Sequence, residues 1–213
     1  MRKTALIATI LTALAATSAA APPASATASG PAHTDELLVD LVTVAGCPLG
    51  SVGVAGSTDN ATVHLSFHSI QVQIGPDVHP TAARKTCQVV LSIHVPDGAA
   101  YAIDRVEYGG YAALAPGAVF TQRSRHYRSG QSPQPAPDHS WTGPFDDVWQ
   151  AVYPIPAEEL HFPPCGTNPY FNTAFILRLD AGTSDPTTET SFAGLDSLHG
   201  LYGVKYHLQT RPC

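Results

Sequence analysis

Apolar and polar residues alternate with a period of two along much of the chain. Residues 87–95 place an apolar side chain at every second position, and residues 204–208 repeat the pattern. Residues 171–179 form a third such run, and Ile176 on its opposite face predicts that both faces of that strand are covered. This period is typical of β-strands that turn one face toward a core. Weaker alternation predicts further strands at 37–44, 101–108, 111–115, 118–128 and 188–193.

Breaks between these runs are predicted by parity and by turn residues. The apolar residues are at odd-numbered positions in 63–67 and at even-numbered positions in 70–74. Because this switch would turn the apolar face over, we expect a bulge or a change of sheet at His68-Ser69. A single segment, 156–160, has the proline and acidic residues of a helical turn. Many short strands without a sustained helical period predict an all-β fold, an antiparallel β-sandwich or a jelly-roll-like single domain. The glycine and proline pairs that predict turns lie at 75–76, 96–98, 109–110 and 116–117.

The first residues of the chain indicate export. Residues 1–26 combine a basic start, a short apolar segment and a closing Ala24-Ser25-Ala26, which is the pattern of a cleaved signal peptide. The apolar segment is too short for a membrane anchor. Residues 27–36 are small and polar and predict a flexible leader. We therefore expect a secreted, extracellular domain over residues 37–213, with no membrane attachment after signal cleavage.

Four cysteines, Cys47, Cys87, Cys165 and Cys213, follow the predicted signal. An even number in an exported chain predicts two disulfides. Sequence alone allows three pairings. We favour Cys47–Cys87 with Cys165–Cys213, because each bond would tie together neighbouring segments. No two cysteines have the close spacing of a zinc site, and we expect no metal and no cofactor.

Composition excludes some classes of partner. The 213 residues carry a net charge of −6, and only 13% of them are charged. An acidic chain lacks the basic face that nucleic acid requires. The apolar fraction of 44% is sufficient for a buried core.

Several short motifs, in order along the predicted mature chain, resemble the DUF4360 family of small secreted proteins from filamentous soil bacteria and fungi, a domain of unknown function. The resemblance implies a secreted, disulfide-bonded β protein, and it supplies no catalytic residue. The segment 133–164 is richer in proline than is usual in that family. The matching motifs lie at residues 46–51, 75–76, 84–88, 110–112, 127–131, 165–166 and 206–208.

Aromatic side chains between two proline-rich loops are the first candidates for ligand binding. The loops are 129–140 and 153–169, and Trp141, Trp149 and Tyr153 lie between or within them. Flat rings on stiff loops can stack on sugar rings. Two tryptophans in a small β domain are, however, also typical core residues. Both interpretations remain open at this point.

Arginines form the second candidate. Arg123 and Arg125 share one parity of a predicted strand, in a basic cluster that also contains His126 and Arg128. Together they could hold a carboxylated sugar or a phosphate. A solvated strand face that discourages edge pairing explains them equally simply.

Catalytic and metal-binding patterns are weak. The adjacent acids Asp146-Asp147 and Glu158-Glu159 could serve glycoside hydrolysis only if two carboxyl groups converged in a cleft. His64 and His68 would lie about 13 Å apart on an unbroken strand, too far apart to bind one ion. We therefore expect a secreted binding protein and no enzyme, with a cell-wall or plant polysaccharide as ligand. The alternatives are a binder or inhibitor of a secreted protein, through the 129–140 loop, and a carboxylate-dependent polysaccharide-degrading enzyme.

Overall fold

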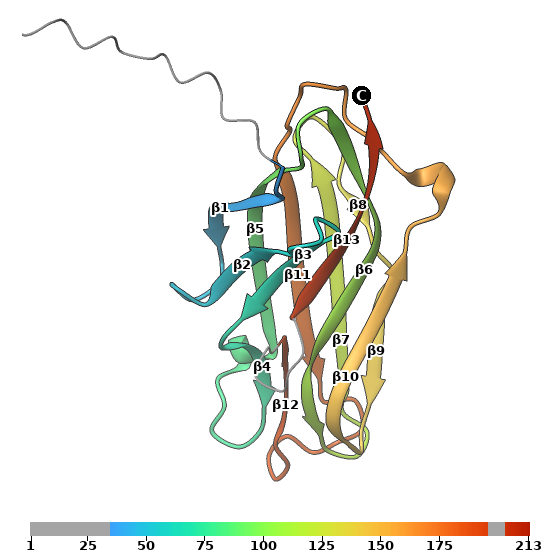
Figure 1. The fold of residues 1–213 in the computed structure, drawn as a ribbon. Coiled ribbons are helices and arrows are strands. Elements are labelled where there is room, and N and C mark those ends of the chain that lie inside the picture. Colours follow the sequence, from blue (N-terminus) through green and yellow to red (C-terminus); the bar gives the residue numbers. More distant parts are fainter. Residues whose placement is uncertain (1–34, 196–202) are drawn as a thin grey trace, which may run out of the picture. The chain divides into compact units, whose positions relative to one another are not determined.

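β-Strands make up nearly all the regular structure of residues 35–195 and 203–213, which the computed structural model describes. They form two antiparallel sheets (Figure 1). The all-β class expected from the alternation is therefore confirmed. The two helical segments described, η1 (Pro80–Ala83) and η2 (Ala157–Glu159), are short 3-10 turns. No described helix is long and apolar enough to cross a membrane. The predicted signal peptide lies outside the described residues.

Sheet A has the strand order β1-β5-β11-β7-β8, and β9 also pairs with β7. Every pairing in it is antiparallel. Its strands are β1 (Leu38–Ala45), β5 (Arg84–His94), β7 (Val119–Arg128), β8 (Gln134–Pro135), β9 (His139–Thr142) and β11 (Phe171–Asp180).

Sheet B is organised around its longest strand, β6, which pairs with β10 along one edge and with β12 and β13 along the other. Leu195 pairs with Gly110 and Val204 pairs with Tyr108, so β12 and β13 follow one another along β6. Beyond these two strands, β4 pairs with β12 and β3 pairs with β13. β2 pairs with the other side of β3 and is an edge strand of the sheet. The strands are β2 (Val52–Gly56), β3 (Thr62–Phe67), β4 (Ile70–Ile74), β6 (Ala99–Leu114), β10 (Phe145–Pro154), β12 (Ser191–Leu195) and β13 (Val204–Pro212).

The break between β3 and β4 occurs at His68-Ser69, where the parity change predicted it. Phe67 and Ile70 are both buried, and Ser69 between them has a φ of 62°. The kink therefore resets the side-chain alternation. Both strands belong to sheet B, so the chain does not change sheet at this point.

Gly109 and Gly110 were expected to form a turn, and this prediction is wrong. Both are extended residues within β6, paired with Gln150 and Trp149 of β10. The reason is the indole of Trp149: a Cβ on Gly110 would lie 2.6 Å from an indole carbon and 1.9 Å from the Gly194 carbonyl oxygen. Glycine is required here for close packing, and not for the backbone conformation of a turn.

Core side chains from the two sheets meet in aromatic contacts. Phe67 of sheet B and Phe175 of sheet A form an edge-to-face pair with ring centroids 5.2 Å apart. Tyr206 of sheet B and Phe171 of sheet A form another at 5.2 Å. Edge-to-face packing is a favoured arrangement of aromatic rings. The sheets therefore pack face to face over one shared apolar layer.

The disulfides pair Cys47 with Cys87 and Cys165 with Cys213, as the sequence favoured. The first ties the segment after β1 to the buried side of β5, and the second ties the loop before β11 to the last residue of the chain. The loops they close span 40 and 48 residues. Chain entropy predicts a stabilisation of about 4 kcal/mol for each loop of this length.

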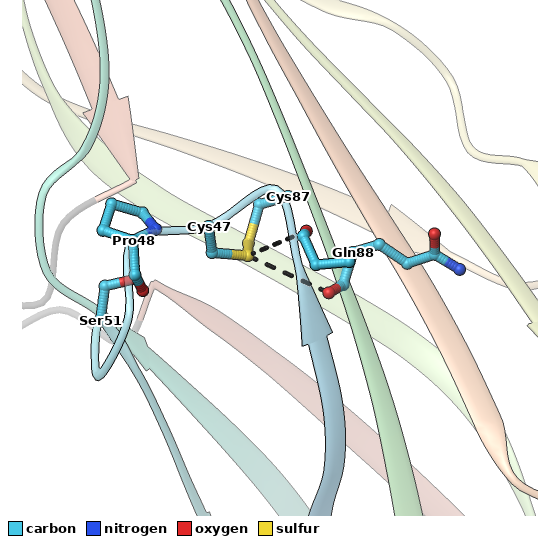
Figure 2. Close-up of a disulfide and its surroundings, with 6 residues drawn as sticks. Cys47, Pro48, Ser51, Cys87 and Gln88 are labelled. Atoms are coloured by element: carbon cyan, nitrogen blue, oxygen red, sulfur yellow. Dashed lines mark hydrogen bonds between the residues drawn. A yellow bond between two sulfur atoms is a disulfide. The ribbon is translucent and has the colours of Figure 1, made fainter.

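Figure 2 shows the tight turn beside the first disulfide. The backbone N–H and the hydroxyl of Ser51 both donate to the Pro48 carbonyl oxygen, at 3.1 and 2.7 Å. Gly46 precedes the turn with a φ of +72°, and a Cβ there would lie 2.4 Å from the Thr86 carbonyl oxygen. Glycine at this position lets Cys47 approach β5.

The inner face of β7 is polar, although it faces the core. After Phe120, each inward side chain carries a polar group: Gln122, Ser124, His126 and Arg128 are all buried. The His126 imidazole makes hydrogen bonds with the Tyr108 hydroxyl at 2.7 Å and with Thr173 Oγ1 at 3.0 Å. Burial in this network lowers the pKa of His126 to about 3.

This burial predicts acid lability. The ordinary pKa of histidine is 6.5 and that of His126 is about 3, so between these values the unfolded state binds more protons than the folded state. The free energy of unfolding should therefore fall as the pH is lowered through this window, by up to ~1.4 kcal/mol per pH unit. Urea unfolding of wild type and His126→Gln between about pH 4.5 and 6.5 measures the effect.

The variant should show the shallower pH slope, whatever its absolute stability. Other groups with lowered pKa values are present in both proteins, so the difference between the slopes isolates His126. Parallel slopes would show that His126 does not couple folding to protonation. The groups shared by both proteins are His64, His139, Asp59, Glu107, Asp138 and Asp185.

Candidate functional site

The two tryptophans lie in contact between the sheets. Trp141 is in β9 of sheet A and Trp149 is in β10 of sheet B, and their ring centroids are 4.7 Å apart. Phe120 packs against both at 5.4 Å. Trp149 is only 1% exposed, so the expectation that it presents a ring face to a ligand is wrong. Its ring is needed to close the core where the chain passes from one sheet to the other.

Tyr153 and Trp141 are half-buried and pack against the same core. Tyr153 follows Trp149 and Ala151 on the inner parity of β10, and burial raises its pKa, with a further contribution from Glu159. All three predicted aromatics therefore lie in strands or at the core, and not on projecting loops. The sequence missed β9 and β10 because proline and aromatic residues obscure their alternation.

Arg123 and Arg125 lie on the outer face of β7, as their shared parity predicted. The Arg123 guanidinium donates to the Asp138 carboxylate, with 2.7 Å between Nε and Oδ1. This pairing lowers the pKa of Asp138 and raises that of Arg123. Arg123 thus anchors the 129–140 loop to the sheet, while Arg125 remains exposed beside Ala174.

The acid pair of β10 does not converge on one point. Asp146 and Asp147 are adjacent in an extended strand, so their side chains point to opposite faces. Asp146 accepts a hydrogen bond from the Tyr111 hydroxyl, and Asp147 accepts one from the Val148 backbone N–H. Among the residues the structure describes, no group of three or more histidines, cysteines or acids is arranged as metal ligands are.

An exposed aromatic pair lies on the outer face of sheet B. Tyr111 of β6 and Phe192 of β12 have ring centroids 5.8 Å apart and planes inclined by 35°. Phe192 is 37% exposed, and Tyr111 is half-buried. Their cross-strand neighbours are small, because Tyr111 pairs with Gly194 and Phe192 pairs with Ala113. The small side chains leave both rings accessible above the sheet.

Polar side chains surround this pair on the neighbouring strands. Gln71 and Gln73 of β4 lie opposite Gly194 and Phe192. Asp146 of β10 lies opposite Ala113. The hydrogen bond to Asp146 is the largest cause of the raised pKa of Tyr111. We call the surface formed by Gln71, Gln73, Tyr111, Asp146 and Phe192 the Tyr111–Phe192 platform.

The platform combines two kinds of group that contact sugars. Its aromatic faces can pack on the apolar faces of a sugar ring, and its amides and carboxylate can bond to hydroxyl groups. From β10 to β4 it crosses three strand spacings, or about 14 Å. In the sequence, the feature that indicates the platform is a single aromatic residue, such as Tyr111, at an outward-facing strand position with glycine or alanine next to it. Sequence reasoning missed it because Tyr111 adjoins the supposed Gly109-Gly110 turn.

Farther along the same face, three basic side chains surround Glu107. Its carboxylate lies 2.9 Å from His207 Nε2, 3.3 Å from Arg105 Nε and 3.6 Å from Lys205 Nζ. Burial alone would raise the pKa of Glu107, but these neighbours lower it overall. The pairs lie on β6 and β13 and link the two strands. We interpret this cluster as structural.

Comparison with known proteins places the chain in a family. Residues 36–213 match the family model described as "Domain of unknown function (DUF4360)". An "uncharacterized secreted protein" of Arthroderma benhamiae is 32% identical over 171 residues, which cover 79% of this chain and 67% of that protein. A solved structure of TmCBM61 with β-1,4-galactotriose aligns over 82% of this chain and 88% of its own, at 10% identity and a TM-score of 0.28.

The burial of the aromatics predicts which of them support the fold. Trp149→Ala should lower the free energy of unfolding by about 3–5 kcal/mol, because it leaves a cavity between the sheets. Phe192→Ala should change it by less than about 1 kcal/mol, since Phe192 lies on the outer face of sheet B, is 37% exposed and leaves no enclosed cavity when truncated. Urea unfolding of both variants provides the comparison. Equal losses would contradict the assignment of Trp149 to the core and Phe192 to the surface.

Proposed function

The chain belongs to the DUF4360 family, and we propose that it is a secreted, non-catalytic protein that binds polysaccharide through the Tyr111–Phe192 platform. The observation that carries this proposal is the exposed aromatic pair above small residues, bordered by amide and carboxylate groups. Gln71 and Gln73 lie beside Gly194 and Phe192 on the outer face of β4, where their amides can bond to sugar hydroxyl groups. The proposed role includes no chemical step.

Secretion is supported by three independent features. The chain begins with the pattern of a signal peptide, its two disulfides suit an oxidising compartment, and its fungal relative is a secreted protein. A polysaccharide outside the cell is a ligand that such a protein would encounter. The platform is flat and crosses several strands, which suits an extended polymer better than a small enclosed molecule.

The alternative partner-binding role, through the 129–140 loop, has less support. Ala136 is buried and donates its backbone N–H to the Ser124 carbonyl oxygen, and Asp138 is paired with Arg123. Residues 129–133 are exposed, as are Pro137 and Asp138, but Asp138 is already engaged by Arg123. The loop therefore presents a smaller free surface than its proline content predicted.

A depletion assay tests the proposal. The secreted, oxidised protein is incubated with insoluble chitin, cellulose, xylan and fungal or plant cell-wall preparations, and the protein left in solution is measured. We expect selective depletion by at least one polymer. Tyr111→Ala and Phe192→Ala should each weaken binding roughly tenfold or more, because each removes a ring that packs on the sugar.

Tyr170→Ala is the matched control, since Tyr170 is another exposed aromatic, 49% exposed, that lies outside the platform. It should bind as wild type does. Circular dichroism and urea unfolding establish that the platform variants remain folded. No depletion by any polymer, or equal binding by wild type and both platform variants, would overturn the proposal.

A further inference from the structure

A buried arginine without an acidic partner lies at one end of the sandwich. Arg128 is the last residue of β7, points inward and is only 7% exposed. Its Nη1 donates to the His161 carbonyl oxygen at 2.7 Å, and its Nη2 donates to the Tyr101 carbonyl oxygen at 2.9 Å. The guanidinium carbon also lies 4.6 Å from the centre of the Tyr101 ring. These contacts fix the plane of the guanidinium.

The contacts leave most of its hydrogen-bonding capacity unused. A guanidinium has five N–H groups, and these two bonds engage only two of them. Its Nε is buried and has no partner, and Arg128 forms no ion pair with any acid in the described chain. Burial raises the pKa of the nearby Tyr101 hydroxyl, and its interaction with Arg128 opposes part of that rise. A buried, uncompensated charge is costly, so an anion beside it would be strongly favoured.

Two cavities adjoin Arg128, and both are also lined by Gln131. The inner one, about 50 Å³, lies between the sheets beside His126 and Phe171. The outer one, about 420 Å³, lies under the proline-rich loop. Ser129, Thr167 and Asn168 in its wall are exposed, so the outer cavity opens to solvent.

The walls of the outer cavity indicate which kind of molecule fits. Phe162 and three prolines provide apolar surfaces, and hydroxyl and amide groups alternate with them. Arg211 stacks on Phe162 with its guanidinium carbon 4.4 Å from the ring centre, which adds a second positive charge at this wall. The inner cavity also has one acid in its wall, Glu159. The prolines are Pro163, Pro164 and Pro169, and the polar residues are Ser129, Gln131, Thr167 and Asn168.

The geometry points to a binding site for a uronic acid, a sugar whose ring carries a carboxylate. The carboxylate would reach the unused N–H groups of Arg128, because a guanidinium pairs well with a two-oxygen anion. The ring and its hydroxyl groups would occupy the outer cavity between prolines and amides. This site is separate from the Tyr111–Phe192 platform: Tyr101 and Tyr111 are ten residues apart on β6, or about 33 Å.

Calorimetric titration tests the site with defined probes: galacturonate and glucuronate as monomers and as trisaccharides, with neutral galactose for comparison. We expect the uronates to bind and galactose to bind much more weakly. Arg128→Met should weaken uronate binding about tenfold or more, because hydrogen bonds to a charged group are lost. Arg128→Lys should also weaken it, since lysine keeps the charge but loses the planar fork.

Arg84→Met is the matched control, because Arg84 is an exposed arginine of β5 in the same sheet and lines neither cavity. It should leave uronate binding unchanged. Removing an uncompensated buried charge need not destabilise the fold, and thermal unfolding of Arg128→Met verifies this. If that variant does not fold, Gln131→Ala supplies the test, since this exposed side chain lines both cavities.

The titrations distinguish two sources of the uronic acid. Binding of the monomers identifies a free sugar acid as ligand, and binding of only the trisaccharides identifies an acidic polymer; both retain the carboxylate at Arg128. No uronate binding by wild type, or equal binding by wild type, Arg128→Met and Gln131→Ala, would overturn the assignment. Neither result depends on the platform, whose variants bind uronate normally if the two sites are independent.

Discussion

The packing of the Trp149 indole against Gly110 is the contact on which the rest of sheet B depends. Because Gly110 has no side chain, β10 lies alongside β6 with a large ring held between the two sheets. β6 can then run without interruption from Ala99 to Leu114 and pair with three other strands. A turn at this point would have divided the sheet. Any larger residue at Gly110 would displace Trp149 or separate β6 from β12.

The second constraint is the polar interior of β7. His126 is tolerated there because Tyr108 and Thr173 satisfy both of its ring nitrogens. Tyr206 extends this network by donating to Thr173 Oγ1 at 2.9 Å. Arg128 differs from these residues, because the groups that it contacts are two carbonyl oxygens and the Tyr101 ring, none of which carries a negative charge. The network around His126 is complete within the protein, and the one around Arg128 is not.

Much of the fold could be predicted from the sequence, because alternation records which face of a strand is buried. The runs 87–95 and 171–179 gave β5 and β11, the parity change gave the break at His68-Ser69, and cysteine spacing favoured the correct disulfides. Alternation fails where both faces are polar. On β7 the alternation predicted that Arg123 and Arg125 share one face of the strand. It could not show that the other face, with His126 and Arg128, is the buried one.

The binding surfaces were harder to predict, because aromatic residues serve both cores and ligands. Trp149 and Phe192 are each single large rings in a strand, and only the tertiary structure assigns one to the interior and the other to solvent. The distinguishing feature is what lies opposite. Gly110 receives the Trp149 ring from the inner side, whereas Tyr111 stands on the outer side with Gly194 as its cross-strand neighbour.

The two proposed sites also differ in what each demands of a ligand. The platform offers aromatic faces and one carboxylate, so a negative charge on the ligand near Asp146 would be repelled. The cavity at Arg128 offers an unpaired positive charge, so a neutral ligand would leave that charge unsatisfied. A polymer composed only of neutral sugars would therefore occupy the first site, and a uronic acid the second. Since both surfaces are built on β6, the uninterrupted strand that Gly110 permits holds them at a fixed separation.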